Sequence, residues 1–385
     1  MTPESQAAPA DRTNWRTAPF NRQAFHQVRG IVPVADIAAG ATPGPLPEAP
    51  VSLDGFSLAL PGGASLDLPG LLAATATDAL VILQDGKLVF ETYADGMTAR
   101  TPHILMSGSK SVTGLLAGIL QRDGDLDLDT GITHYVPEME ETGYQGATLR
   151  NLIDMRAGVT LDVEQAHDYD AAVSSLPGGA NFHGLLQSLR DQSTDHGGVF
   201  SYVSANTDLV GWAMERATGQ SIATLVSERL WAPLGAERDA YVVVDRDGSP
   251  WCSGGFCMTA RDFARIGALL ASDGRRGDVE IVPRAFIDDL CDGGDRAAWR
   301  DGEWGQTFGF VSRNMSYRAG WYAIHDAPGL LFAMGIHGQN LFIDRANRTV
   351  IAKLSSQASR IDGRAIGLTH MAVAELQRLL PGAAG

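Results

Sequence analysis

Cysteine is scarce in this chain of 385 residues. Its three cysteines, Cys252, Cys257 and Cys291, are an odd number in a long chain, which favours reduced thiols over a disulfide framework. Cys252 and Cys257 have no cysteine or histidine at metal-ligand spacing beside them. The sequence therefore predicts no structural zinc site.

Long apolar runs and positive charge are also lacking. No apolar run approaches the roughly 20 residues that a membrane span needs, and Met1–Arg16 has no apolar stretch of the signal-peptide kind. The chain has 30 lysines and arginines against 45 aspartates and glutamates, a net charge of −15 that would repel nucleic-acid phosphates and anionic lipids. We therefore expect a cytoplasmic protein that binds neither nucleic acid nor membranes.

The hydrophobic content of 44% is that of a folded protein, and the length allows two domains or one large enzyme-sized fold. Residues 1–75, rich in Pro, Ala and Gly, predict an arm on the surface of a later domain, with one helix near Arg22–Arg29. Within Asp78–Tyr93, two apolar runs flank Asp85-Gly86, a pair that readily adopts the positive φ angles of a type I′ turn. An antiparallel sheet is expected to begin there.

The spacing of apolar residues then changes to that of helices and later returns to that of strands. The expected helices are Val112–Leu120, Leu149–Met155, Thr207–Ala217, Ile222–Leu230, Ala260–Leu270 and the closing Ile366–Leu380. The expected late strands are Leu330–Met334, Asn340–Asp344 and Thr349–Ser355. We predict an α/β domain made of residues 1–110 and 300–385, a mostly helical domain of residues 111–299, and a site in the cleft between them.

Lysine is also scarce. Only Lys87, Lys110 and Lys353 occur, so arginine carries nearly all of the positive charge. Lys87 follows the Asp-Gly turn, and Lys353 fits the exposed face of a strand. Lys110 instead begins an apolar helix, where desolvation can produce the neutral amine that arginine cannot supply. Among the three lysines, Lys110 is therefore the candidate for a catalytic role.

Ser107 and Lys110 form a Ser-x-x-Lys pair, which a helix places on one face within hydrogen-bonding reach. The amine could take the serine's proton, and the helix N-terminus would favour a developing oxyanion. The alternative is that Ser107 only caps the helix while Lys110 extends its charge into solvent.

A polar segment from Phe200 to Asp208 precedes a second helix. Tyr202 beside the ammonium of Lys110 could ionise more easily and relay protons between Ser107 and a leaving group. The alternative is a loop tyrosine over a helix cap made by Ser204, Asn206 or Thr207, and the spacing leaves both open.

Five longer blocks carry a family resemblance: Met106–Gly118, Leu149–Gly158, Ser201–Gly219, Gly254–Gly267 and Gly335–Asp344. Through them the chain resembles the β-lactamase-related serine hydrolases, within the group of nylon-oligomer amidases and carboxylesterases. The resemblance implies an α+β fold of the β-lactamase and penicillin-recognising type, an antiparallel sheet flanked by helices with an inserted helical domain. It also implies a small amide or short-chain ester as substrate, no cofactor and no metal, and it suggests a homodimer.

The resemblance implies roles for single residues as well. Ser107 would be the acylated nucleophile, Lys110 its general base and Tyr202 the proton relay, with an oxyanion hole made by the backbone N–H groups of Ser107 and Ile336. Substrate contacts would come from Tyr169, Ser253, Trp321 and His337. A structural histidine, hydrogen-bonded near Gln339 and Asn340, is an equal alternative for His337.

The chain also departs from the family pattern. β-Lactamases and penicillin-binding relatives carry Lys-[Ser/Thr]-Gly on the strand facing the nucleophile, and this tripeptide is absent here, where Ala333–His337 stands in its place. The segment 162–197 is shortened, and Ser253 replaces an expected asparagine or histidine. We therefore do not expect β-lactamase activity as the main function.

Three other classes of protein are alternatives to this assignment. An α/β-hydrolase would need Gly-x-Ser-x-Gly between a strand and a helix, and the sequence has no such pentapeptide. A carboxylesterase without nylon-oligomer activity and a catalytically silent binding module remain as alternatives. The presence of Ser107, Lys110 and Tyr202 together argues against the silent module.

Overall fold

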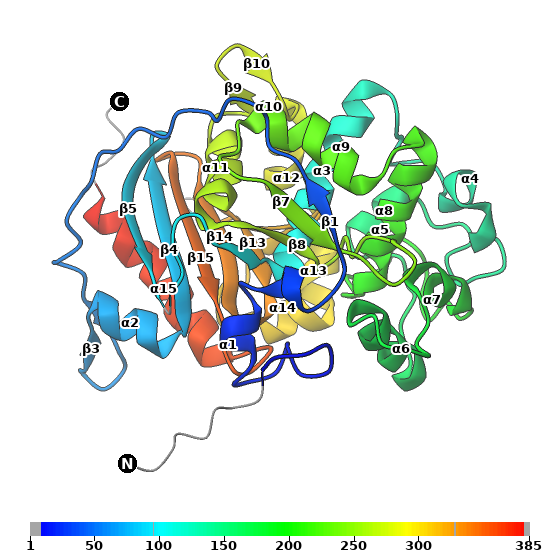
Figure 1. Ribbon diagram of the computed structural model, residues 1–385, viewed down its shortest axis with the longest axis horizontal. Coiled ribbons are helices and arrows are strands. Elements are labelled where there is room, and N and C mark those ends of the chain that lie inside the picture. The colour runs from blue at the N-terminus through cyan, green and yellow to red at the C-terminus, as the bar shows by residue number, and fades with distance from the viewer. Residues whose placement is uncertain (1–8, 95, 327–328, 381–385) are drawn as a thin grey trace.

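The computed structural model describes residues 9–94, 96–326 and 329–380. Its centre is a seven-stranded antiparallel sheet (Figure 1). In spatial order the strands are β11 (Met315–Arg318), β12 (Trp321–Ile324), β13 (Leu330–Gly335), β14 (Gln339–Asp344), β15 (Thr349–Ser355), β4 (Thr77–Gln84) and β5 (Lys87–Tyr93). The predicted α+β class and the predicted late strands are confirmed.

The two ends of the chain meet in this sheet, as the sequence predicts. Strand β15 pairs with β4, and Ile351 lies opposite Ile82. Strands β4 and β5 are joined by the predicted two-residue turn, in which Asp85 has φ 49° and Gly86 has φ 71°. Positive φ at both positions is what a type I′ turn requires, and it explains the Asp-Gly sequence.

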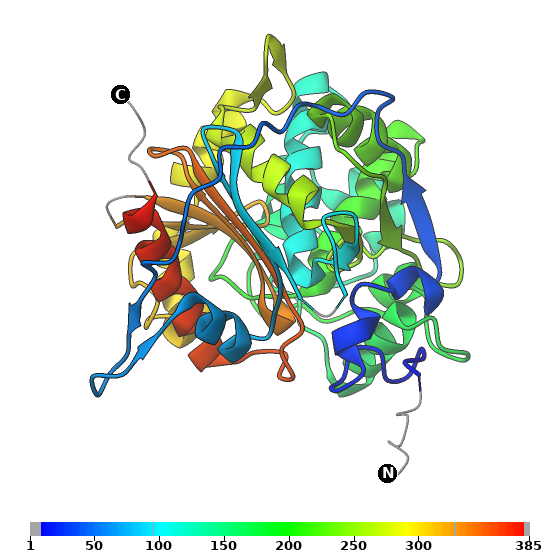
Figure 2. The same cartoon turned by 60° about the vertical axis from the view of Figure 1, so that its left-hand side comes forward.

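Helices cover both faces of the large sheet, so its strands are apolar on both faces (Figure 2). On β4, Leu80 and Ile82 pack in one cluster with the C-terminal helix α15 (Gly363–Leu379). The alternate residues Val81 and Leu83 pack in another cluster with α11 (Ala260–Ala271). Successive side chains of a strand point to opposite faces, and all eight residues of β4 are buried.

A second sheet brings the N-terminal arm to the site. Its order is β1 (Val34–Ile37), β7 (Ala240–Val243), β8 (Phe256–Thr259) and β6 (Pro102–Ile104). The arm therefore takes part in a sheet through β1, which pairs with β7, and also contains α1 (Asn21–Ala24) and the hairpin strands β2 (Leu58–Ala59) and β3 (Ser65–Leu66).

The remaining helices follow the predicted spacing, and each predicted helix is present. They are α2 (Leu68–Ala74), α3 (Ser109–Asp123), α4 (Ile132–Tyr135), α5 (Leu149–Ile153), α6 (Val163–Val173), α7 (Phe182–Ser188), α8 (Ser204–Thr218), α9 (Ile222–Val226), α10 (Ala232–Leu234), α12 (Arg284–Asp292), α13 (Arg296–Asp301) and α14 (Glu303–Thr307). A short hairpin of β9 (Arg275–Arg276) and β10 (Val279–Glu280) follows α11. Within the predicted helical segment 111–299, strands β7 and β8 and helix α11 lie with the sheets, while α4–α9 lie to one side (Figure 1).

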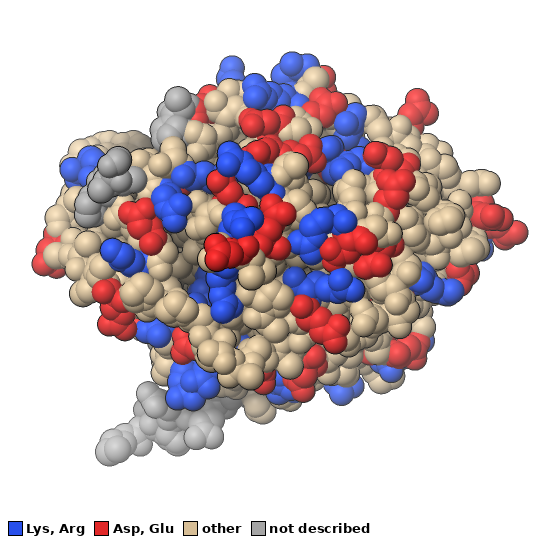
Figure 3. Space-filling view, turned by 90° about the horizontal axis from the view of Figure 1, so that it is seen from above, with Lys and Arg blue, Asp and Glu red and all other residues tan. Residues whose placement is uncertain are grey.

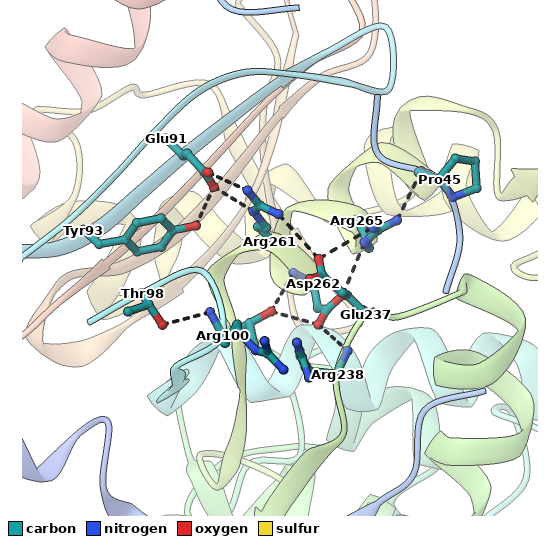
Figure 4. Close-up of polar contacts among 11 residues, drawn as sticks. Pro45, Glu91, Tyr93, Thr98, Arg100, Glu237, Arg238, Arg261, Asp262 and Arg265 are labelled. Atoms are coloured by element: carbon teal, nitrogen blue, oxygen red, sulfur yellow. Dashed lines mark hydrogen bonds and ion pairs between the residues drawn. The ribbon is translucent and has the colours of Figure 1, made fainter. Parts of the chain in front are cut away.

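An ion-pair network connects the two sheets (Figure 4). Arg261 of α11 donates two hydrogen bonds to the Glu91 carboxylate of β5, of 2.8 and 2.5 Å, and lies 3.7 Å from Glu237. The buried Asp262 accepts from the backbone N–H of Glu237, just before β7. The Arg261 guanidinium lowers the pKa of Glu91, because its hydrogen bonds favour the ionised carboxylate.

Charges of both signs alternate over the face seen from above in Figure 3, so the net negative charge is not gathered there in one patch. In the described part of the chain, no helix is both long enough and apolar enough to cross a membrane. All three cysteines are free thiols, and Cys252 and Cys257 are buried.

Candidate active site

Ser107 lies where the two sheets approach each other. Strand β6 ends at Ile104, and a 3₁₀ turn, Met106–Gly108, leads directly into α3. A Cβ on Gly335 would lie 2.4 Å from the carbonyl oxygen of Leu105 and 3.1 Å from the Ser107 nitrogen. The end of β13 can therefore approach the Ser107 backbone only because this residue is glycine.

Lys110 is buried with 2% of its surface exposed, one turn of α3 beyond Ser107. Its Nζ contacts the oxygens of three serines: Ser107 Oγ at 3.3 Å, Ser204 Oγ at 3.1 Å and the Ser253 carbonyl at 2.8 Å. The reading in which Lys110 extends into solvent is therefore wrong. Helix α3 has no side-chain cap, so Ser107 does not serve as one.

Tyr202 lies against the same amine, but through its ring. Lys110 Nζ is 4.8 Å from the centre of the Tyr202 ring, a cation–π arrangement. The other side of the ring stacks on Trp304, with 4.1 Å between ring centres. The Tyr202 hydroxyl is buried without a hydrogen-bond partner among the described residues.

A cavity of about 440 Å³ opens in front of Ser107 and Tyr202. Its apolar wall comes from α14, β13 and the start of α15, and consists of Trp304, Phe308, Met334, Ile361 and Ile366. Arg360 and Asp362 are its charged residues, and Asp362 caps α15 by accepting from Ala365. An apolar chain of a few carbons fits such a wall.

Ile336, the second residue expected in the oxyanion hole, also lines this cavity, directly after Gly335. Met106, before Ser107, has φ 48°, and His337, after Ile336, has φ 63°. Left-handed backbone is costly outside glycine and is retained where it positions neighbouring groups. Both backbone segments are thus held in unusual conformations beside the cavity.

Behind Lys110, a hydrogen-bond network connects Tyr169 and Ser253 to a buried carboxylate, Asp208. Asp208 accepts from the Ser253 N–H at 2.8 Å, the Ser253 hydroxyl at 2.9 Å and the Tyr169 hydroxyl at 2.9 Å. Trp251 Nε1 donates to the Tyr169 hydroxyl at 2.7 Å. Burial raises the pKa of Asp208 to about 6, although these donors and Lys110 oppose the rise.

The other two residues expected to contact substrate lie elsewhere. Trp321 is fully buried on β12 beneath α3, and its Nε1 donates to the Ser111 carbonyl. His337 Nδ1 donates to the Gln357 carbonyl at 2.7 Å, and its ring lies 5.1 Å from that of Phe25. Neither lines the catalytic cavity. His337 lines a neighbouring cavity, and its Nε2 has no hydrogen-bond partner among the described residues.

Three residues at the site were not singled out from the sequence for these roles. Ser204, considered only as a helix cap, bonds Lys110, and helix α8 has no side-chain cap. Asp208 follows four residues later, on the same face of α8, a spacing that could have identified it. Trp304 is remote in sequence, and no local pattern indicates its stacking on Tyr202.

The fold is that of the β-lactamases and penicillin-binding proteins, and the comparison with known families agrees. The Beta-lactamase family profile matches residues 69–376, and the chain belongs to this family. It is 33% identical over 366 residues to the 6-aminohexanoate-dimer hydrolase of Paenarthrobacter ureafaciens, covering 92% of this chain and 90% of that protein.

Solved structures give the same relationship. A protein of Bacillus anthracis that carries the provisional name 6-aminohexanoate-dimer hydrolase superposes with a TM-score of 0.87 at 27% identity, over 97% of this chain and 99% of that chain. A family VIII carboxylesterase superposes with a TM-score of 0.58 at 17% identity, over 80% of this chain and 96% of that one, a likeness of fold. The protein is a hydrolase of the β-lactamase family.

Proposed function

We propose that the protein is a serine hydrolase that cleaves small amides or short-chain esters through an acyl-enzyme. The observation that carries this proposal is the grouping of Ser107 Oγ, Ser204 Oγ and the Tyr202 ring around the buried Lys110 amine, at the end of an open cavity. A nucleophile needs an adjacent base, and these contacts supply one.

In the first step, the Ser107 oxygen attacks the substrate carbonyl while its proton passes to the neutral amine of Lys110. A neutral amine has two N–H donors and one lone pair. The donors match Ser204 Oγ and the Ser253 carbonyl, which leaves the lone pair for the Ser107 hydroxyl. The carbonyl oxygen, now negative, accepts from the backbone N–H groups of Ser107 and Ile336.

In the second step, the tetrahedral intermediate collapses and the bond from carbonyl carbon to the leaving nitrogen or oxygen breaks. Tyr202 donates its hydroxyl proton to the leaving group and regains a proton from Lys110. Water then attacks the acyl-enzyme and gives a proton to Lys110. The bond from the acyl carbon to Ser107 Oγ breaks, Lys110 returns the proton to Oγ, and the acid leaves with the serine and the neutral amine restored. The buried and otherwise unpartnered Tyr202 hydroxyl supports this role.

The cavity and the relatives support the proposed substrate class. The wall formed by Trp304, Phe308 and Met334 suits an aliphatic chain next to the reacting carbonyl. One relative bears the name of an amide-cleaving enzyme, 6-aminohexanoate-dimer hydrolase, and a fold neighbour is a carboxylesterase. Amide and ester cleavage share the steps above and differ in the need to protonate the leaving atom.

The test compares hydrolysis of the 6-aminohexanoate linear dimer with hydrolysis of p-nitrophenyl butyrate. Ser107→Ala and Lys110→Met are each expected to lower kcat by several orders of magnitude on any substrate that the wild type cleaves. Ser188→Ala and Lys87→Met, on α7 and in the exposed β4–β5 turn, are matched controls that should retain wild-type rates. Full activity in Ser107→Ala would refute the mechanism, and cleavage of the ester alone would identify a carboxylesterase.

A further inference from the structure

A second cavity, of about 360 Å³, lies on the other side of the turn Ile336–Gly338. It is enclosed by the N-terminal arm, helix α6 and the loop at residues 358–360, and Figure 2 shows the arm beside the helical region. Two of its lining residues, Ile336 and Arg360, also line the catalytic cavity. The two cavities therefore flank the residue expected to bind the substrate carbonyl.

The second cavity differs from the first in its charge. Its wall contains three arginines, Arg12, Arg16 and Arg360, and one carboxylate, Asp170. Asp170 is already engaged, because it lies 2.9 Å from Arg16 Nη2. Arg12 and Arg360 have no carboxylate partner within the described ranges, and Arg12 has a single hydrogen bond from Nε to the Ile31 carbonyl. The cavity therefore carries an excess of positive charge in a protein whose net charge is −15.

The arm that contributes this charge is held in place. Arg16 is ion-paired with α6, and its guanidinium lies 5.7 Å from the Trp15 ring centre and 6.0 Å from that of Trp251. Trp15 is buried with 1% of its surface exposed. The backbone N–H of His337 donates to the Arg360 carbonyl at 2.9 Å, which ties the loop that carries Arg360 to the turn at Ile336. The Arg16 side chain and the backbone at Arg360 are thus held in place, while the side chains of Arg12 and Arg360 are exposed.

We propose that this arginine-lined cavity binds an anionic group of the substrate, a carboxylate, at the end of the molecule remote from the apolar cavity. The inference rests on the proposed function, because it places the scissile carbonyl between the two cavities at Ser107 and Ile336. Arg360, which lines both cavities, determines the preference for a substrate with a carboxylate, and Arg12 adds to this preference. A planar guanidinium can bind a carboxylate through two parallel hydrogen bonds, which gives both affinity and orientation.

The carboxylate could lie on the acyl part or on the leaving group of the substrate, and two matched pairs of substrates distinguish these cases. On the acyl side, mono-p-nitrophenyl glutarate is compared with p-nitrophenyl pentanoate. On the leaving-group side, N-butyryl-6-aminohexanoate is compared with N-butyrylhexylamine. For the wild type, the charged member of one pair is expected to have the higher kcat/KM.

In the variant Arg360→Gln, the ratio of kcat/KM between charged and neutral members of that pair is expected to fall about tenfold or more, the usual effect of losing a hydrogen bond to a charged group. Arg12→Gln should lower the ratio less. Arg364→Gln removes the same charge from an exposed position four residues further along and should keep the wild-type ratio. An unchanged ratio in Arg360→Gln, or an equal fall in Arg364→Gln, would overturn the inference.

Binding without turnover separates this inference from the proposed function. In Ser107→Ala, calorimetric titration should show tighter binding of N-butyryl-6-aminohexanoate or of glutarate than of N-butyrylhexylamine, and addition of Arg360→Gln should remove the difference. That result would support the anion site even if the wild type cleaved none of the substrates. Equal or absent binding of charged and neutral compounds to Ser107→Ala would refute it.

Discussion

Lys110 and Lys353 are both buried lysines whose amine contacts a serine hydroxyl, yet they differ in what surrounds them. Lys353 Nζ lies 2.6 Å from Ser355 Oγ, and Ser355 is fully buried in the sheet. Ser107, the partner of Lys110, lines a cavity. A serine and a lysine in contact are therefore not sufficient for a reactive site, because the hydroxyl must also be open to substrate.

Tyr202 is predicted to matter more for amides than for esters. A departing amine must be protonated before it leaves, whereas p-nitrophenolate leaves without a proton. In Tyr202→Phe we expect kcat/KM for the amide substrate to fall by about a hundredfold or more, and kcat/KM for p-nitrophenyl butyrate to fall much less. Tyr135→Phe, on α4, is the matched control. Equal losses on both substrates would contradict the role of proton donor.

Asp208 gives a prediction about stability and pH. Its pKa is raised from 3.8 to about 6 by burial, so the folded state binds a proton more tightly than the unfolded chain does. Ionisation of this group therefore lowers the free energy of unfolding as the pH rises from about 4 to about 6, after which the effect is constant. Asp208→Asn removes this dependence.

Urea unfolding of Asp208→Asn and wild type at a series of pH values measures the difference. The free energy of unfolding of the variant, relative to that of the wild type, should increase between about pH 4 and about pH 6. Above that range the difference between the two proteins should stay constant. Asp54→Asn, at an exposed turn, should show no such change. A difference that stays constant from pH 4 to pH 6 would mean that the Asp208 carboxyl titrates alike in both states.

Local spacing was enough to bring Ser107 and Lys110 together, because three residues on a helix fix their relative positions. It was not enough for Trp321 and His337. Trp321 pairs with Arg318 in the sheet and contacts the Ser111 carbonyl of α3, and His337 has a left-handed backbone and contacts the Gln357 carbonyl. Register and backbone conformation of this kind are set by long-range packing, which the sequence around each residue does not reveal.

At the scale of elements, strand β15 contains a buried lysine, Lys353, which is shielded from water within the sheet. Burial lowers the pKa of Lys353 to about 7, although the nearby Asp78 carboxylate opposes this. Between about pH 7 and about pH 10 the unfolded chain holds a proton that the folded state releases, so stability rises with pH across that window. Asp78 also lies 3.2 Å from His103 and accepts from Ser356.

Lys353→Met is expected to remove this rise. The variant should exceed the wild type in free energy of unfolding by its largest margin near pH 7, and the margin should shrink towards pH 10. Urea unfolding at intermediate pH values checks this, with Lys87→Met at the exposed β4–β5 turn as the control. A margin that grows with pH would contradict the assignment of Lys353 as a destabilising buried charge.

The elements that the sequence predicted are those with strong local signals. The β4–β5 hairpin has its Asp-Gly turn, and α3, α8, α11 and α15 have sustained apolar spacing. The sheet β1-β7-β8-β6 was missed because its strands have three or four residues each, and both of its edge strands, β1 and β6, pair with strands more than a hundred positions away in sequence. Short strands of this kind are stabilised by partners that local patterns cannot identify.

At the scale of the whole molecule, the site is assembled where the two sheets and the helical region meet. Strand β6 of the small sheet delivers Ser107, β13 of the large sheet delivers Ile336, and α8 delivers Ser204. The Arg261–Glu91 ion pair and its neighbours connect the two sheets (Figure 4). The change in apolar spacing predicted a sheet made from both ends of the chain, a helical segment between them and a site in the cleft. The resemblance of long sequence blocks predicted which residues meet at that site.

The most direct test of the account is the mass of the intact protein during turnover of p-nitrophenyl butyrate after rapid acid quenching. The account predicts a species heavier than the free protein by one butyryl group, with the modification located on Ser107 by peptide mapping. The species should be absent in Ser107→Ala and present in the control Ser188→Ala. A butyryl group on any other residue, or turnover in Ser107→Ala with no adduct, would contradict the acyl-enzyme mechanism.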